Sequence, residues 1–221
     1  MCGIAGLARG TPREINRGVL LRMAAALRHR GPDGFGLYAG DGVGFAHTRL
    51  SIIDLHGGAQ PLTNEDGQVI VVFNGEIFNY LDLRATLQDL GHRFRTHSDT
   101  EVLAHGYEEW GPALIPRLNG EFAFAAFDRR KRELLLARDR FGIRPLYYAT
   151  LGDDLLFASE AKAIFAAGEL RAEPDYAGID EVFTCWAARP PRTVFRGISA
   201  LEPGTYARWK DGRLRLTRYY D

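Results

Sequence analysis

The alternation of apolar and polar positions predicts a chain of many short strands with a few helices between them. Runs of four to eight apolar or alternating residues that lie between turn formers are typical of strands. We expect strands at residues 2–9, 35–39, 43–49, 69–73, 92–96, from 122 onward, and at 133–137, 146–150, 155–158 and in a last hairpin over 204–220. The run 69–73 is continuously apolar, as in strands buried on both faces, and it stops at Asn74-Gly75-Glu76.

Apolar residues also recur at helical spacing. Ile15, Val19, Met23 and Leu27 lie four residues apart and are followed by the breakers at 31–32. Further helices are expected after Asn79, which can cap one, and at 98–107, 160–167 and 176–186.

The helix at 98–107 is expected to begin with a capping box. Ser98 and Glu101 have the Ser-x-x-Glu spacing, which puts Asp99 in the first helical turn. The positive end of the helix dipole should favour the ionised form of Asp99 there.

Composition narrows the class of protein. The 221 residues are 46% hydrophobic, enough for one compact α+β domain over residues 1–221. Basic and acidic residues number 28 each, so no net field attracts nucleic acid or an anionic membrane. The basic run at 129–132 is expected to be an exposed hairpin turn. No signal peptide and no apolar run of ~18 residues is evident, so we expect a cytoplasmic protein.

The two cysteines are expected to differ in role. Cys185 lies among apolar residues and is expected to be buried filler, and a disulfide with Cys2 is not expected in a reducing cytosol. Cys2 follows Met1, and removal of Met1 would give Cys2 a free α-amine beside its thiol. Since an α-amine has an ordinary pKa of about 7.7–8.0, it can accept the thiol proton near neutral pH. The alternative is that Cys2 is only a small apolar residue that opens a strand.

Other polar residues at segment ends could serve such a nucleophile. Asn74 and the Gly75 N–H could hold an oxyanion, although Asn-Gly is also a common hairpin turn. Arg49 could bind a carboxylate, and Glu76 with Asp99 could bind an ammonium group. Each of these charges could equally be an exposed or capping residue.

The six histidines give no sign of a metal site in the sequence. His29, His47, His56, His92, His97 and His105 show no ligand spacing beyond chance. We therefore expect no metal ligand in the chain.

A series of motifs in order resembles the class II glutamine amidotransferase domain of glutamine-hydrolysing asparagine synthetases. The motifs are MCGIAG (1–6), RHRGPD (28–33), HTRLSIID (47–54), AQPL (59–62), NGEIFNY (74–80), SDTEV (98–102), RDRFGIRPLYY (138–148), SEAKA (159–163) and LEPG (201–204). The resemblance covers essentially the whole chain. It implies an N-terminal-nucleophile hydrolase fold, a four-layer αββα sandwich of two antiparallel sheets between helices.

The resemblance also implies roles for particular residues. Cys2 would attack the side-chain amide of L-glutamine, release ammonia and form a thioester that water hydrolyses to glutamate. Asn74 and Gly75 would hold the oxyanion. The α-carboxylate and α-ammonium groups would be held by Arg49, Glu76 and Asp99, and Leu50, Ile52 and Ile53 would line the same pocket.

The family continues into an ATP-dependent synthetase domain, which we expect to receive the ammonia from a fused or separate partner. Its Ser-Gly-Gly-x-Asp phosphate loop does not occur in this sequence. Cofactors are thus expected only in that absent domain, as ATP and Mg²⁺, with none in this chain. Homodimerisation stays open.

Two alternatives remain at this point. The same glutaminase fold could serve an amidotransferase that aminates a different carboxylate, because the absent domain chooses the acceptor. The chain could also be a non-catalytic interaction module that retains the fold.

Overall fold

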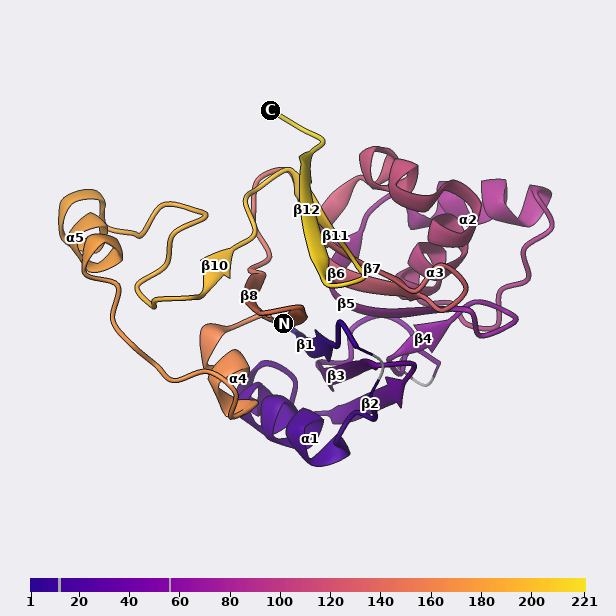
Figure 1. Cartoon of the computed structure of the whole chain (residues 1–221). Coiled ribbons are helices and arrows are strands. Elements are labelled where there is room, and N and C mark those ends of the chain that lie inside the picture. Colours follow the sequence, from indigo (N-terminus) through magenta and orange to yellow (C-terminus); the bar gives the residue numbers. More distant parts are fainter. Residues whose placement is uncertain (12, 56) are drawn as a thin grey trace.

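The computed structural model describes residues 1–11, 13–55 and 57–221, which form two six-stranded antiparallel sheets (Figure 1). The first sheet has the strand order β10-β8-β9-β1-β3-β2, and the second has the order β12-β11-β7-β6-β5-β4. The strands are β1 (Gly3–Ala8), β2 (Gly34–Gly40), β3 (Val43–Arg49), β4 (Leu62–Thr63), β5 (Val69–Ile77), β6 (Gly120–Asp128), β7 (Glu133–Arg138), β8 (Tyr147–Leu151), β9 (Asp154–Ala158), β10 (Ser199–Ala200), β11 (Thr205–Lys210) and β12 (Arg213–Arg218).

Helices cover the outer faces of both sheets. Helices α1 (Arg17–Ala26) and α4 (Ala161–Ala166) pack on the first sheet, whereas α2 (Tyr80–Asp89) and α3 (Asp99–Trp110) pack on the second. Apolar side chains of both sheets, such as Phe45 and Phe127, fill the space between them. The layers are therefore helix, sheet, sheet, helix, which confirms the αββα sandwich. Two short 3₁₀ helices, η1 (Arg28–Arg30) and η2 (Gly111–Arg117), follow α1 and α3.

Strand β5 shows how one apolar run serves two cores. Val69, Val71 and Phe73 face α2 and α3, while Ile70 and Val72 face the first sheet. Side chains alternate along a strand, so Asn74 continues the row that faces the first sheet. The prediction of burial on both faces is confirmed.

The prediction that this strand stops at Asn74-Gly75-Glu76 was wrong, and so was the alternative of a hairpin turn. Strand β5 continues to Ile77, and Gly75 pairs with Phe122 of β6. A Cβ on Gly75 would lie 2.0 Å from the carbonyl oxygen of Glu121. Glycine thus lets β6 approach closely enough for pairing to continue past Asn74.

The predicted strand at 92–96 does not form. The backbone N–H groups there bind side-chain carboxylates: Arg93 donates to Glu65, and Arg95 and Thr96 donate to Glu101, at 2.6–2.8 Å. These three donors are therefore not available to pair with a neighbouring strand.

Both helix starts differ in detail from their predictions. Ser98 caps α3 by accepting the Thr100 N–H at 3.2 Å, but Glu101 binds the preceding segment and does not complete the capping box. Asn79 precedes α2 without a side-chain cap bond, because its amide bonds to Arg117 and Asn119.

Cys185 is exposed, so the prediction that it is buried filler was wrong. It lies at the end of α5 (Tyr176–Cys185), which stands apart from the other helices (Figure 1). The apolar residues around it, Phe183 and Trp186, are also exposed, at 83% and 94%. Cys2 and Cys185 are both free thiols.

The basic run at 129–132 forms the turn between β6 and β7, as predicted. Among the described residues, every helix is too short or too polar to cross a bilayer.

Candidate active site

Cys2 immediately precedes β1, an inner strand of the first sheet, and is anchored at its backbone and at its sulfur. Its carbonyl oxygen accepts a hydrogen bond from Arg30 Nε at 2.9 Å. Its Sγ lies 3.4 Å from the Leu50 nitrogen, which donates to it, and 3.6 Å from the Leu50 carbonyl oxygen. The thiol therefore has a fixed position at the end of β3.

A charge cluster holds Arg30 in place. Arg30 Nη1 donates to Glu160 Oε1 at 2.9 Å, and Lys162 and His29 contact the same carboxylate. Burial would raise the pKa of Glu160, but the hydrogen bonds from Arg30, Lys162 and His29 outweigh it and lower this pKa to about 2. Glu160 therefore stays ionised at neutral pH, and its contacts tie the segment that holds β1 to the start of α4.

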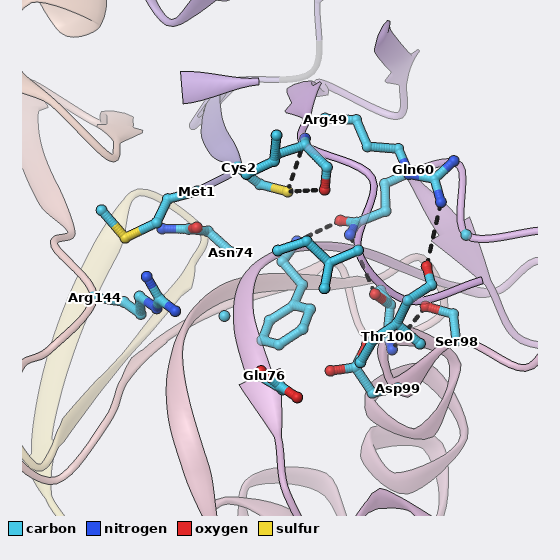
Figure 2. A pocket seen from close by; sticks show the side chains of 16 residues that line it. Met1, Cys2, Arg49, Gln60, Asn74, Glu76, Ser98, Asp99, Thr100 and Arg144 are labelled. Carbon is cyan, nitrogen blue, oxygen red and sulfur yellow. Dashed lines mark hydrogen bonds between the residues drawn. The ribbon is translucent and has the colours of Figure 1, made fainter. Parts of the chain in front are cut away.

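Asn74 lies in the same pocket near this terminus, on the face of β5 that meets the first sheet (Figure 2). The residue is 1% exposed, and its Nδ2 has no hydrogen-bond partner. A buried donor without a partner costs roughly 1–3 kcal/mol. An acceptor atom of a ligand in the pocket would remove that cost.

Asp99 lies in the first turn of α3, as predicted, and is 4% exposed. Its Oδ2 accepts the Ile77 N–H at 3.0 Å. Backbone N–H groups at this helix start favour the ionised form, as predicted, but burial first, and then the negative charge of Glu76, outweigh them and raise the pKa of Asp99 to about 6. Glu76 itself is exposed at the pocket rim.

Arg49 ends β3, as predicted, and its guanidinium shapes the loop that follows. It donates to the carbonyl oxygens of Asp54 at 2.6 Å, Leu55 at 3.2 Å and Ile53 at 3.4 Å. This loop carries Leu50, Ile52 and Ile53 into the pocket lining, although Ile52 is 70% exposed.

A single pocket collects every residue that we predicted for the site (Figure 2). These residues are Cys2, Arg49, Leu50, Ile52, Ile53, Asn74, Gly75, Glu76 and Asp99. A thiol, an unpartnered amide and separated charges of both signs thus share one cavity. Such a set suits a free amino acid that carries a reactive side-chain carbonyl.

Similarity to known proteins agrees with this geometry. The family described as "Glutamine amidotransferase domain" matches residues 1–220. The chain belongs to this family.

The amidotransferase domain is similar to one part of larger proteins. It is 37% identical over its whole length to asparagine synthetase [glutamine-hydrolyzing] 3 of Bacillus subtilis, and 46% identical over 75% of its length to asparagine synthetase [glutamine-hydrolyzing] 2 of the same organism. It covers only 37% and 22% of those two proteins. The domain therefore spans a minor part of the relatives that it matches.

Solved structures support the fold. The glutamine phosphoribosylpyrophosphate amidotransferase of B. subtilis aligns over 99% of this domain and 49% of its own chain, with a TM-score of 0.72 and 21% sequence identity. This likeness confirms the fold, a sandwich of two antiparallel sheets between helices.

Several pocket residues of the amidotransferase domain were missed from the sequence. They are Met1, Gly58, Gln60, Phe73, Ser98, Thr100 and Arg144. Gln60 connects its own loop to β5 and α3. Its Oε1 accepts the Phe73 N–H at 2.7 Å, and its Nε2 donates to Thr100 Oγ1 at 3.1 Å. The AQPL motif at 59–62 already contained Gln60 and was the available signal.

Arg144 lies near Met1 on one side of the pocket (Figure 2). Its guanidinium pairs with Glu121, and its Nε is buried without a partner. The motif at 138–148 includes Arg144, but nothing in its spacing showed that this side chain would reach the pocket.

His47 lies on β3 and is 1% exposed. Burial lowers its pKa to about 3, which the hydrogen bond with the Phe73 backbone only partly opposes. His47 is therefore neutral at physiological pH and adds no charge to the site.

Proposed function

We propose that this domain hydrolyses L-glutamine to glutamate and ammonia, with Cys2 as the nucleophile. The observation that carries the proposal is the pocket itself, which places the Cys2 thiol, the unpartnered Asn74 amide and the charges of Arg49 and Asp99 around one cavity. No separate histidine is needed, because a terminal α-amine can serve as the base.

The first half of the proposed reaction forms a thioester. The α-amine of Cys2 takes the thiol proton, and the sulfur attacks the side-chain amide carbon of glutamine. The carbonyl oxygen becomes an oxyanion, to which Asn74 Nδ2 and the Gly75 N–H donate. The C–N bond then breaks, the α-ammonium returns its proton to the leaving nitrogen, and ammonia departs.

The second half regenerates the enzyme. Water gives a proton to the α-amine and attacks the thioester carbon, through a second oxyanion at the same donors. The C–S bond breaks, the sulfur regains its proton, and glutamate leaves. The same residues thus act twice.

Recognition of the amino acid falls to the charged residues at the other end of the pocket. In this proposal Arg49 binds the α-carboxylate, and Glu76 and Asp99 bind the α-ammonium group. The substrate cation would also favour the ionised form of Asp99, whose pKa burial has raised.

Met1 must be absent from the active protein. Its side chain lies in the pocket near Asn74 and Arg144 (Figure 2). Removing it would free the α-amine of Cys2 and clear space for the substrate.

We further propose that the ammonia passes to an ATP-dependent synthetase domain that makes asparagine. The names of the relatives support this use, and those relatives are much longer than this chain. ATP and Mg²⁺ would serve that domain, while the glutaminase half needs no cofactor of its own. Homodimerisation stays a prediction.

The decisive experiment measures ammonia and glutamate released from glutamine by the purified protein, after intact-mass spectrometry has shown that Met1 is gone. Activity is expected in the processed protein and is lost in Cys2→Ala. Cys185→Ala is the matched control, because it removes the other free thiol, which is exposed on α5. Activity that survives in Cys2→Ala means that another group is the nucleophile. A processed protein without activity favours a non-catalytic module.

A further inference from the structure

A second cluster of titratable side chains lies outside the pocket, beside the middle of α3. Its members, which we call the His92–His105 cluster, are Glu65, His92, His105 and Glu108. Each offers one ligand atom, and these atoms all lie within 4.8 Å of one another. Glu65 comes from the turn between β4 and β5, His92 follows α2, and the other two lie on α3.

The centre of this cluster holds a buried nitrogen without a partner. His105 is 0% exposed, and its Nδ1 makes no hydrogen bond, although it lies 3.1 Å from Glu65 Oε2. Nδ1 of His92 lies 3.7 Å from Glu65 Oε1 and 3.8 Å from Glu108 Oε2. Two ring nitrogens and two carboxylates therefore converge on the same small space.

The outer nitrogens of both rings face other carboxylates. His105 Nε2 lies 3.5 Å from Glu101 Oε1, and His92 Nε2 lies 3.4 Å from Glu109 Oε2. A carboxylate only accepts, so a ring proton on Nε2 would satisfy this outer contact and leave each Nδ1 with a lone pair that points to the centre. A carboxylate behind a histidine is the usual support for a metal-bound imidazole.

The two carboxylate ligands are held in a similar way. Glu65 Oε1 accepts the Arg93 N–H at 2.6 Å, and Glu108 Oε2 accepts from Asn64 Nδ2 at 2.8 Å. Every member of the cluster thus has an outer partner that orients it. With the ring protons on Nε2, lone pairs would face lone pairs at the centre, and a cation would remove that repulsion.

The spacing fits a tetrahedral metal. Zinc bonds to nitrogen and oxygen of about 2.0–2.2 Å put neighbouring ligand atoms about 3.3–3.6 Å apart. His105 Nδ1 lies 3.1 Å from Glu65 Oε2 and His92 Nδ1 lies 3.8 Å from Glu108 Oε2, on either side of that range. Two imidazoles exclude the all-oxygen shells that Ca²⁺ and Mg²⁺ prefer.

We propose that the His92–His105 cluster is a structural site for Zn²⁺. Four protein ligands close the coordination shell, which is the pattern of a structural rather than a catalytic zinc. The ion would join the β4–β5 turn and the segment after α2 to α3. Asp99, in the first turn of α3, lines the pocket roughly 14 Å along the helix from Glu108. Bound metal would therefore steady the helix that carries a pocket carboxylate.

This proposal adds ligands that the sequence did not reveal, because the spacing of the histidines along the chain hides their meeting in space. Only His105 and Glu108 are close in sequence. His56 lies outside the described residues.

The test titrates Zn²⁺ into the full-length protein by calorimetry after metal has been removed with a chelator. A background with Cys2→Ala and Cys185→Ala prevents zinc from binding to thiols. One equivalent is expected to bind, with a higher melting temperature. Co²⁺ in place of zinc is expected to give a tetrahedral visible spectrum without a thiolate band.

Variants assign the ligands. His92→Gln and Glu108→Gln change partly exposed side chains and are expected to weaken zinc binding at least 100-fold while the protein stays folded. Glu109→Gln removes an outer partner and should weaken binding by about 10-fold. The matched control is His97→Gln, a nearby exposed histidine outside the cluster, which should bind zinc unchanged.

Two results would overturn the proposal. One is no binding of Zn²⁺ up to millimolar concentration, which would leave the cluster as a set of imidazole–carboxylate ion pairs. The other is binding that persists unchanged in the double variant His92→Gln/Glu108→Gln, which would place the ion elsewhere.

Discussion

The two ends of the pocket are built in different ways. At the end with Cys2, the side-chain amide proposed to bind the oxyanion lacks a partner in the protein: Asn74 Nδ2 is buried and makes no hydrogen bond. At the other end, Arg49 donates to three loop carbonyls and Asp99 accepts the Ile77 N–H. The first end therefore has a donor free to bind the oxyanion, a charge that exists only during the proposed reaction. The second already has the shape in which it would bind an amino acid.

This contrast predicts that substitutions at the first end lower kcat and that substitutions at the second raise KM.

The largest of these effects is expected for Asn74→Ala. It should lower kcat for glutamine about 10²–10³-fold with little change in KM, because an oxyanion donor acts mainly in the transition state. Stability should barely fall, since no hydrogen bond of the Asn74 side-chain amide nitrogen is lost. Steady-state kinetics and thermal melting test both statements. The control is Asn79→Ala, which loses two side-chain hydrogen bonds away from the pocket and should melt earlier with kcat unchanged.

Arg49→Ala is expected to raise the KM for glutamine about 10–100-fold, the loss of a charge-assisted hydrogen bond. Arg49→Lys should have a KM between those of the unchanged protein and Arg49→Ala, because an ammonium group cannot contact the loop carbonyls and a substrate together. Arg22→Ala is the matched control, since Arg22 also donates to backbone carbonyls but lies on α1. A lower kcat at constant KM in Arg49→Ala would contradict the predicted difference between the two ends of the pocket.

The pH dependence of glutamine use should report Asp99. Since burial raises its pKa to about 6, kcat/KM should fall about tenfold per pH unit below pH 6 as the carboxylate is protonated. Asp99→Asn should show a higher KM and lack this acid limb. If kcat/KM of Asp99→Asn still falls below pH 6 in the same way, another group is responsible for that fall.

Asp99→Asn is expected to affect stability in the opposite direction to activity: it should impair glutamine use but not lower the melting temperature. Because the folded state raises the pKa of Asp99, the folded protein holds this proton more tightly than the unfolded chain does. The contribution of Asp99 to stability is therefore present below about pH 4 and is lost as the pH rises through 6. Asp99→Asn keeps an oxygen for the Ile77 N–H, so it should melt at an equal or higher temperature at pH 7. A lower melting temperature would contradict this.

The smallest effect is expected for Ile52→Ala. The side chain is 70% exposed on the loop that Arg49 holds, so KM should change less than about threefold. A larger change would show that Ile52 is buried by the bound substrate.

Local pattern predicted the parts of the fold that depend on burial alone. The strand over 43–49, the doubly buried run of β5 and the first helix all follow from apolar spacing. The motif resemblance then brought Cys2, Asn74 and Asp99 to one pocket, which no spacing argument could have done.

The failures have a common cause in long-range contacts. Strand β5 continues past Asn74 because β6 approaches at Gly75, and the segment 92–96 gives its N–H groups to Glu65 and Glu101. Burial likewise overrides the helix dipole at Asp99. These partners are distant along the chain or depend on depth in the fold, so local sequence could not show them.

The position of Met1 has a practical consequence for any preparation of this protein. An affinity tag added before it would leave Cys2 as an ordinary internal residue. A tag at the other terminus, which lies beyond β12 and apart from the N-terminus (Figure 1), avoids this. Specific activity would then report how completely the expression host trims the leader methionine, batch by batch.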